Sequence, residues 1–571
     1  MRDFIRLAET ARDCLFLCLV VLLSLLLYVG SLGFYSDDWS FLGYFSVSPD
    51  QSFPGLFRYL LGPQVQMRPV QVLYLSGLYS LFGLSPLGYH LVNAAVLVAI
   101  PVLFYLALRE LGQERIVALA APVVYILLPH YSTDRFWVAA FQANLSMALY
   151  FLSLYSDLRA LRSRLMGFWS WKLLSLLCLL GSTLAYEVAL PVFLLNLLLV
   201  WSRGRQRYGA APSSSWPSAR VLALLGSNLI ALVAVLIFKR LTTIRIGDSP
   251  VSFGEYTYWI LRRAVALHSP DYEAGLNIKR ALEVNYGDYG LGLPRVVWKI
   301  LREYPDPAIL VLGGFLGLII FSYLYRTIAS QGRTEAISQS GMMKWIGGGV
   351  AVFALGYAVF LTNYNVIFTP TGIGNRTAIA AAVGIALSWV GGLGWISTFL
   401  SARYWRQRVF CALITLLGVS GFLINNTIAT FWMVAYRQER MILADIFQRF
   451  PSLPAGSTLI LDGVCPYVGP AIVFESSWDL TGALMTFYRD HTIRADVVTP
   501  NLQVEGDSVS TSLYNLKYRY PYENLFVYHF GQKRAFPIPD AEAARRYFQS
   551  FSPDKSNGCP QGYAGHGVSV F

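Results

Sequence analysis

Charged residues are scarce in this chain of 571 residues, because only 14% of them are Asp, Glu, Lys or Arg. Globular proteins in water carry about 25% charged residues, so an ordinary solvated surface over the whole molecule is excluded. The sequence also lacks the Gly-x-Ser-x-Gly, His-Glu-x-x-His, Cys-x-x-Cys and Walker motifs. These absences leave serine-hydrolase, zinc-protease, dithiol and nucleotide-hydrolase chemistry without support.

Long apolar blocks take the place of those features. Hydrophobic residues make up 55% of the chain and the mean hydropathy is +0.48. The blocks approach the roughly 20 residues of a bilayer span, so we expect an all-α polytopic membrane protein. The first block is too long for a signal-peptide core and no small-x-small site follows it, so no cleaved leader is expected. About eleven spans are predicted, at 14–33, 87–108, 116–130, 141–157, 173–186, 188–201, 221–241, 308–325, 345–362, 377–398 and 409–432.

The distribution of charge predicts the orientation. Cytosolic segments carry an excess of Lys and Arg. With the N-terminus in the cytosol, the inner segments hold the whole net charge of +12 and the outer segments are balanced. The basic balance therefore indicates membrane topology rather than nucleic-acid binding. Lys239-Arg240, near an outer end, is the local exception and fits either a lipid-phosphate contact or snorkelling. Only Tyr186-Glu187 joins the spans on either side, and one long broken helix is the alternative there.

Two adjacent carboxylates, Asp37 and Asp38, open the first outer loop at residues 34–86. Carboxylates next to a membrane span are costly to desolvate and are functional candidates. The alternative is a solvated loop start in which Ser36 or Asp37 caps a short helix.

The same loop continues to Arg68-Pro69 and then to residues 70–83, whose apolar positions share one helical face. Pro69 suits a first helical turn and Gly83 suits a stop. We predict a helix lying in the membrane interface with Arg68 at its head. Arg68 fits either a phosphate ligand or a headgroup anchor.

Three further polar residues stand out near predicted outer ends of spans. Asp134 lies in the outer loop 129–137, Glu187 is flanked by apolar helix, and Arg376 heads the span at 377–398. A lone carboxylate in such a place is a functional candidate, and an Arg there suits phosphate. The alternatives are a water-exposed interface residue for Glu187 and a lipid headgroup pair for Arg376.

The composition changes at about residue 433. Strand-sized apolar runs at 457–461, 471–474 and 524–528 alternate with helical patterns at 480–488 and 541–548. We therefore predict two domains, a transmembrane domain at 1–432 and a small extracytoplasmic α/β domain at 433–571. Of the six cysteines, only Cys465 and Cys559 fall outside, where an oxidising compartment allows them to pair. Two free surface thiols are the alternative.

Several of these elements together resemble the GT-C glycosyltransferases. They are the Asp37-Asp38 pair, Arg68-Pro69, the helix end at 81–83, and the run from Pro86 to Asn93 that includes His90. The segment 185–191 around Glu187 is similar to the acidic motif of the protein mannosyltransferase and aminoarabinose transferase branch. The resemblance covers residues 1–200 by motif and the later spans by topology only.

The resemblance implies a membrane enzyme that transfers a sugar, with inversion, from a polyprenyl-phosphate donor to a glycan, lipid or protein acceptor. One Asp of the pair is the base and the other orients it, binds sugar hydroxyls or holds a metal, with a narrow preference for Asp38 as the base. Arg68 and Arg376 would stabilise the leaving phosphate, and His90, Asp134 and Glu187 complete the expected substrate-binding set. No cofactor is required, although a divalent metal is compatible with the pattern.

Two other functions fit the spans. A transporter or flippase of a lipid-linked sugar would more often show paired repeats with broken helices, which the sequence does not show. A non-catalytic assembly protein acting through the outer domain is the other alternative. The absence of eukaryotic targeting signals and the small size favour a bacterial inner membrane.

Overall fold

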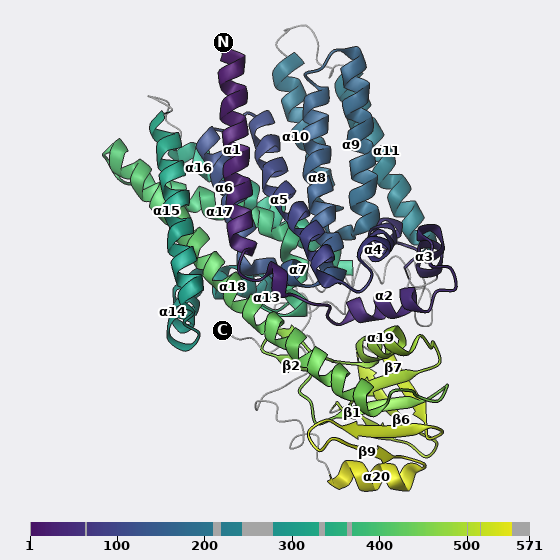
Figure 1. Cartoon of the computed structure of the whole chain (residues 1–571). Coiled ribbons are helices and arrows are strands. Elements are labelled where there is room, and N and C mark those ends of the chain that lie inside the picture. Colours follow the sequence, from purple (N-terminus) through teal and green to yellow (C-terminus); the bar gives the residue numbers. More distant parts are fainter. Residues whose placement is uncertain are drawn as a thin grey trace.

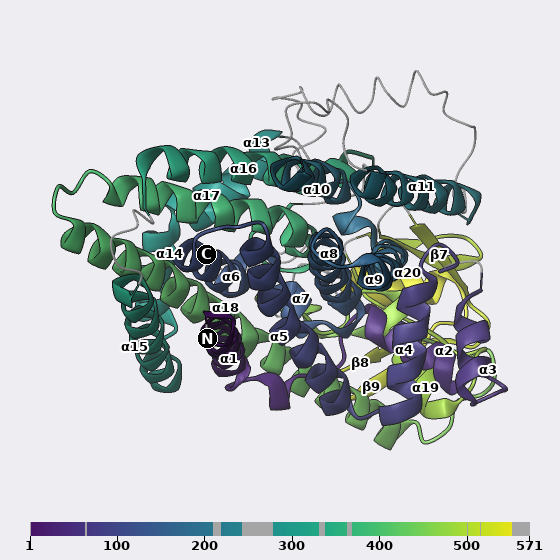
Figure 2. The ribbon, with the colours of Figure 1, turned by 90° about the horizontal axis from the view of Figure 1, so that it is seen from above.

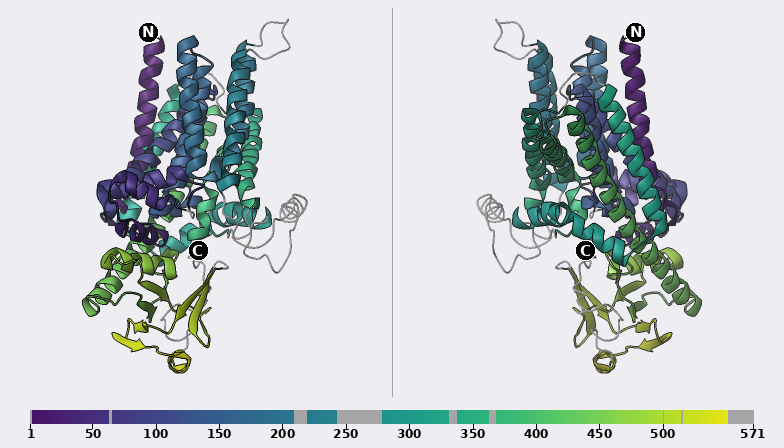
Figure 3. Two further views of the ribbon diagram at one scale, coloured as in Figure 1. Left: turned by 90° about the vertical axis from the view of Figure 1, so that its right-hand side faces the viewer. Right: turned by 90° about the vertical axis from the view of Figure 1, so that its left-hand side faces the viewer.

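A computed structural model describes residues 2–62, 65–208, 219–242, 278–330, 337–362, 368–499, 501–513 and 516–550. Figure 1 shows a helical bundle with a small α/β domain at one end. Helix α1 (Arg2–Leu25) begins at the opposite end of the bundle, as the two side views in Figure 3 also show. The expected fold class, a helical membrane part followed by a small domain with strands, is confirmed.

Each predicted span falls on a separate helix, and α9 and α10 are two helices joined by the turn η4 (Glu187–Ala189) rather than one broken helix. Within the described ranges, seven segments are long and apolar enough to cross a membrane. The number of eleven spans therefore stays a prediction. Besides α1, the bundle helices are α5 (Pro86–Glu110), α6 (Arg115–Leu127), α8 (Phe141–Ala160), α9 (Leu165–Ala185), α10 (Val192–Tyr208), α11 (Ala219–Thr242), α15 (Pro307–Ser330), α16 (Gln339–Ala358), α17 (Ile379–Ser397) and α18 (Arg403–Arg449).

Small residues allow α16 and α17 to pack closely, and Figure 2 shows the two helices side by side. A Cβ added at Gly349 would lie 2.6 Å from the carbonyl oxygen of Gly384, and one at Gly356 would lie 2.6 Å from the Cα of Ala381. Helices in lipid associate through such close backbone contact, because lipid tails are as apolar as the side chains. This contact fixes the start of α17, next to which a short 3-10 turn carries Arg376.

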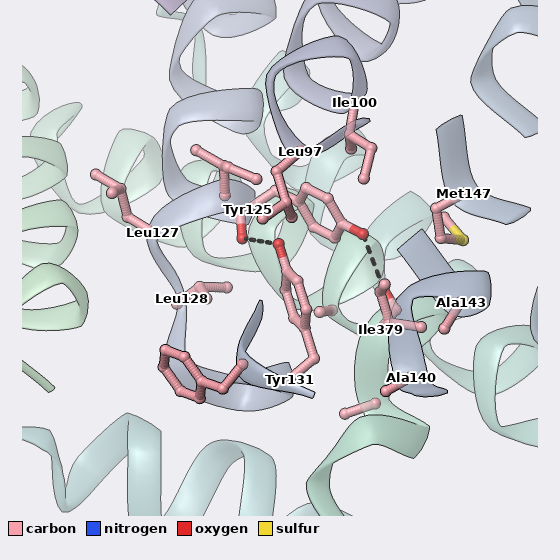
Figure 4. Packing of buried hydrophobic residues seen from close by; sticks show 14 of the residues in the cluster. Leu97, Ile100, Tyr125, Leu127, Leu128, Tyr131, Ala140, Ala143, Met147 and Ile379 are labelled. Carbon is pink, nitrogen blue, oxygen red and sulfur yellow. Dashed lines mark hydrogen bonds between the residues drawn. The ribbon is translucent and has the colours of Figure 1, made fainter. Parts of the chain in front are cut away.

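A buried aromatic pair ties three elements together beneath the outer loops (Figure 4). Tyr125 of α6 stacks on Tyr131, whose hydroxyl donates a 2.8 Å hydrogen bond to the Tyr125 carbonyl oxygen. The Tyr125 hydroxyl donates to the carbonyl oxygen of Ile379 on α17 (3.2 Å). Each hydroxyl is satisfied in the apolar core, so burial of the rings carries no unpaired polar group.

The helices of the loop at residues 34–86 lie between the bundle and the α/β domain (Figure 1). They are α2 (Asp37–Ser46), α3 (Phe53–Leu60) and α4 (Pro69–Phe82). The predicted helix at 70–83 is confirmed as α4, with Pro69 in its first turn and Gly83 ending it at a φ of 54°. Glycine adopts this left-handed conformation without a steric cost. The other short elements between the bundle helices are η1 (Val29–Ser31), η2 (Pro129–Tyr131), α7 (Thr133–Phe136), η3 (Val138–Ala140), α13 (Ile278–Leu282), η6 (Glu283–Leu291), α14 (Leu293–Glu303), η7 (Val359–Thr362) and η8 (Ile373–Ala378).

The α/β domain is built on a four-stranded sheet of order β4-β1-β8-β9. Strands β4, β1 and β8 are parallel, with Thr458 opposite both Arg494 and Leu525, and β9 is antiparallel. The predicted strands and both predicted helices are confirmed. The elements are β1 (Thr458–Asp462), β2 (Tyr467–Val468), β3 (Ala471–Ile472), α19 (Ser477–Tyr488), β4 (Arg494–Val497), β5 (Gln503–Val504), β6 (Ser508–Leu513), β7 (Leu516–Pro521), β8 (Leu525–His529), β9 (Arg534–Pro537) and α20 (Ala541–Ser550).

The domain boundary predicted between residues 432 and 433 falls inside α18, which continues without a break to Arg449. Charged residues enter this part of the helix, as at Arg437, Arg440 and Asp445. Such residues are good or acceptable helix formers, so the change in composition marks where the helix leaves the apolar region and not where it ends. Cys465 is disulfide-bonded, whereas Cys559 lies outside the described residues, so their pairing stays a prediction.

Candidate functional site

A cavity of about 290 Å³ lies at the end of the bundle that faces the α/β domain. Four residues that the sequence predicted at separate places in the chain meet on its wall: Asp37, Arg68, Asp134 and Arg376. They come from α2, the residue before α4, α7 and η8. The structure therefore joins three loops, far apart in sequence, in one polar cavity.

Asp37 faces the cavity, and Asp38 does not. The side chain of Asp38 is 2% exposed, and it accepts hydrogen bonds from the backbone N–H groups of Tyr35 (2.9 Å) and Ala139 (2.6 Å). Both of its oxygens are therefore used to join the start of α2 to η3. Because a base must reach the substrate, this arrangement favours Asp37 over Asp38 as the candidate base, and the choice between them stays a prediction.

Burial raises the pKa of Asp37 above its usual value, whereas the positive charges of Arg376 and Arg68 oppose this rise. A carboxylate in a partly desolvated site becomes a stronger base, since its charged form is less stabilised by water. The same cations keep the ionised form accessible. Asp37 thus has the position and the environment of a general base.

Arg68 is held by a compact ion cluster at the N-terminus of α4. Its guanidinium pairs with Glu187 (2.9 Å) and lies over the ring of Tyr186, 4.5 Å from the centroid. Lys239 of α11 pairs with the same carboxylate (2.7 Å) and donates to the Met67 carbonyl oxygen (3.0 Å). Two cations share one anion, so the cluster keeps a net positive charge beside the cavity.

Glu187 belongs to this cluster and is absent from the residues that line the cavity. Burial alone would raise the pKa of Glu187, but the charges of Arg68 and Lys239 outweigh burial and lower the pKa to about 2. Glu187 thus holds Arg68 in place beside the cavity, and its predicted role in substrate binding stays a prediction. Lys239, one of the two basic residues that departed from the charge pattern of the predicted topology, also belongs to this cluster.

Arg376 presents an uncompensated charge to the cavity. It lies over the ring of Trp137, 4.9 Å from the centroid, and Trp137 donates from Nε1 to the Tyr35 carbonyl oxygen (2.9 Å). Within the described ranges no carboxylate lies at ion-pair distance from its guanidinium. An arginine held on an aromatic face, with its planar fork free, suits a phosphate group.

Asn375, which sequence reasoning missed, joins the loops that carry Arg376 and Asp134. Its Oδ1 accepts from the Thr133 backbone N–H (3.1 Å), and its Nδ2 donates to Ser132 Oγ (2.8 Å) and the Pro370 carbonyl oxygen (3.1 Å). It is 2% exposed. An asparagine in a polar loop gives no signal of such a role, because its partners Ser132 and Thr133 lie about 240 residues away.

Unpaired acceptors line the rest of the cavity. Both carboxyl oxygens of Asp134 and the Oε1 atoms of Gln71 and Gln142 are buried with no hydrogen-bond partner in the part of the chain that the structure describes. Burial raises the pKa of Asp134 well above its usual value, and Arg376 opposes this rise. Buried acceptors without partners are costly, so the wall is suited to a ligand that brings hydroxyl donors.

His90 does not line the cavity, and its predicted role in substrate binding stays a prediction. It lies on α5 and donates from Nε2 to the carbonyl oxygen of Gly33 (2.9 Å). It is 2% exposed and packs edge-to-face on Phe141. His90 therefore fixes the backbone at Gly33, four residues before Asp37. No group of three or more His, Cys, Asp or Glu residues suited to a metal ion occurs among the described residues.

Comparisons with known proteins give structural matches only. No family profile matches the chain, and no curated protein does. The chain is similar to ArnT from Cupriavidus metallidurans bound to undecaprenyl phosphate, with 14% identity, a TM-score of 0.38, and coverage of 84% of this chain and 85% of that one. The apo state of that ArnT gives 13% identity, a TM-score of 0.38 and 85% coverage of both chains.

An oligosaccharyltransferase from Archaeoglobus fulgidus, tethered with an acceptor peptide, gives 13% identity and a TM-score of 0.37. It is covered over 63% of its length, by 84% of this chain. ArnT and the oligosaccharyltransferase are GT-C membrane glycosyltransferases, the family that the sequence motifs resemble.

Proposed function

We propose that the chain is a membrane glycosyltransferase that uses a polyprenyl-phosphate sugar as donor and an extracytoplasmic hydroxyl as acceptor. The observation that carries the proposal is the arrangement around the cavity, where Asp37 shares one wall with the uncompensated cation Arg376 and the unpaired acceptors of Asp134 and Gln142. A sugar phosphate has the matching groups, an anion for the arginine and hydroxyls for the acceptors.

The proposed step is a single displacement. Asp37 takes the proton of the acceptor hydroxyl, the acceptor oxygen bonds to the anomeric carbon, and the bond from that carbon to the phosphate oxygen breaks. The bonding electrons leave with the lipid phosphate, and the sugar inverts. Arg376 and Arg68 stabilise the charge that grows on the leaving phosphate, which is worth most in a site with little water.

The place of the cavity fits a donor that stays in the membrane. Arg68 and Lys239 lie together where α4 meets the end of α11. This cationic cluster would hold the phosphate at the headgroup level while the polyprenyl chain remains in the lipid. No metal ion has a role in the proposed step.

Release of free polyprenyl phosphate tests the proposal. Purified protein is incubated in micelles with a set of polyprenyl-phosphate sugars and simple glycan, lipid and peptide acceptors, and the lipid products are identified by mass spectrometry. We expect free polyprenyl phosphate and a glycosylated acceptor in equal amounts. A second assay places the protein in sealed vesicles. Donor that stays intact in micelles and moves uncleaved across these vesicles would show a transporter and overturn the proposal.

We also propose that the N-terminus is cytosolic and that the α/β domain lies outside, in a bacterial inner membrane. The Lys and Arg excess on the segments at the α1 end of the bundle supports this orientation. A reporter that is active only outside the cytosol, fused after Phe571, is expected to be active. A fusion that works only as a cytosolic reporter would contradict it.

A further inference from the structure

The α/β domain touches α2, the helix that carries Asp37, at close range. Helices α2 and α19 cross with glycine against glycine, and a Cβ added at Gly43 would lie 2.8 Å from the Cα of Gly482. A Cβ at Gly482 would collide with the carbonyl group of Trp39. Backbones approach so closely only where side chains are absent, so the domain is seated firmly on α2.

Ser36, the residue immediately before Asp37, has an unusual backbone conformation. Its φ is 45° and it is 1% exposed. Positive φ is disfavoured for residues that have a Cβ, and such strain persists only when the surroundings hold it in place. The side chain of Ser36 does not cap α2. It points instead to the α/β domain.

Glu475 is the group that holds Ser36. The Ser36 hydroxyl donates to Glu475 Oε1 (2.8 Å), and Trp478 Nε1 donates to Ser36 Oγ (3.3 Å). Tyr467 donates from its hydroxyl to the other carboxyl oxygen of Glu475. Glu475 is 3% exposed. The carboxyl group is therefore fixed on one side by its own domain and bonds to the catalytic loop on the other.

We propose that Glu475 is a positioning residue through which the α/β domain aims Asp37 into the cavity. The bond from Ser36 stabilises the strained conformation that begins α2 at Asp37. Without it, Ser36 would relax to an ordinary φ and change the direction in which α2 begins. This inference rests on the proposed function, since it assumes that Asp37 is the base.

Four ionisable groups act on Glu475 from the elements around it: Asp37 of α2, Arg376 of η8, Tyr467 of β2 and Asp479 of α19. Burial raises the pKa of Glu475 to about 7, with the hydrogen bonds from Tyr467 and Ser36 opposing. The Ser36 bond is stronger when the carboxyl group is charged, so positioning improves as the pH rises through about 7. The same negative charge repels that of Asp37 and raises the pKa of the base.

A pH profile of kcat/KM for release of polyprenyl phosphate tests this inference. Glu475→Gln keeps an oxygen that accepts from Ser36 but removes the charge. We expect kcat to fall about 10-fold, because the hydrogen bond from Ser36 loses its charged acceptor and weakens, with KM for the donor within about two-fold. The limb where activity rises with pH should move to lower pH. A buried structural role alone would lower activity without moving this limb.

Glu505→Gln is the matched control, because Glu505 makes ion pairs with Lys517 and Arg519 on the surface of the same domain. Ser36→Ala removes the bond from the other side, and it serves also if Glu475→Gln fails to fold. In a double-mutant cycle the two changes should be clearly non-additive. Additive effects, or an unmoved acid limb in Glu475→Gln, would overturn the inference. Absence of release by the wild-type protein would instead overturn the proposed function.

Discussion

Asp37→Asn is expected to lower the release of polyprenyl phosphate by about 10²–10⁴-fold, the usual contribution of a general base. The amide is nearly isosteric with the carboxylate, and Asp37 faces a cavity rather than the core, so the protein should stay folded. Single-turnover release measures the chemical step, and thermal unfolding in detergent measures stability.

Asp38→Asn provides the contrast. Its carboxylate accepts two backbone hydrogen bonds, and an amide leaves at least one of those N–H groups facing a donor. A buried donor without a partner costs about 1–3 kcal/mol, so this variant should lose stability as well as activity. Wild-type turnover in Asp37→Asn would show that Asp37 is not the base of the proposed step. Normal turnover in both variants would show that the pair only begins α2.

Arg376→Gln is expected to lower kcat by about 10²–10³-fold, as for removal of one group that stabilises developing charge. The charge of Arg376 also lowers the pKa of Asp37, so its loss should raise that pKa and move the acid limb of the profile to higher pH. This shift is opposite in direction to the one expected for Glu475→Gln.

Two further variants make the Arg376 result specific. Arg376→Lys should recover part of the rate, because lysine supplies the charge but not the planar fork. Arg519→Gln removes an arginine whose side chain is 56% exposed on the α/β domain, and it should turn over normally. Activity of Arg376→Gln within about two-fold of wild type would mean that another group stabilises the leaving phosphate.

Local patterns in the sequence predicted local structure well. Pro69 and Gly83 mark the ends of α4 because each acts on its own backbone conformation. The strand-sized runs of the α/β domain became β1 and β8 for the same reason. Asp37, Arg68, Asp134 and Arg376 could be singled out because charge beside an apolar span is rare and stands out without knowledge of its neighbours.

What the sequence could not predict depends on distant partners. Asp37 and Asp38 are alike in sequence, and the backbone N–H groups of Tyr35 and Ala139, which bind Asp38, distinguish their surroundings. His90 was singled out with its motif, but the motif did not show that its Nε2 donates to the carbonyl oxygen of Gly33. Ser36 and Glu475 are 439 residues apart, and neither a serine nor a glutamate in a polar segment signals a contact of that range.

The unbroken course of α18 from the bundle into the α/β domain has a consequence for how this chain can change. Its 47 residues form a continuous helix about 70 Å long. Each residue added to or removed from this helix rotates the α/β domain that follows it by about 100°. Loops elsewhere on a surface tolerate insertions, but an insertion in α18 would rotate the α/β domain about the helix axis. The length of α18 is therefore a constraint as strict as the identity of a side chain in the cavity, although no residue between 433 and 449 lines that cavity.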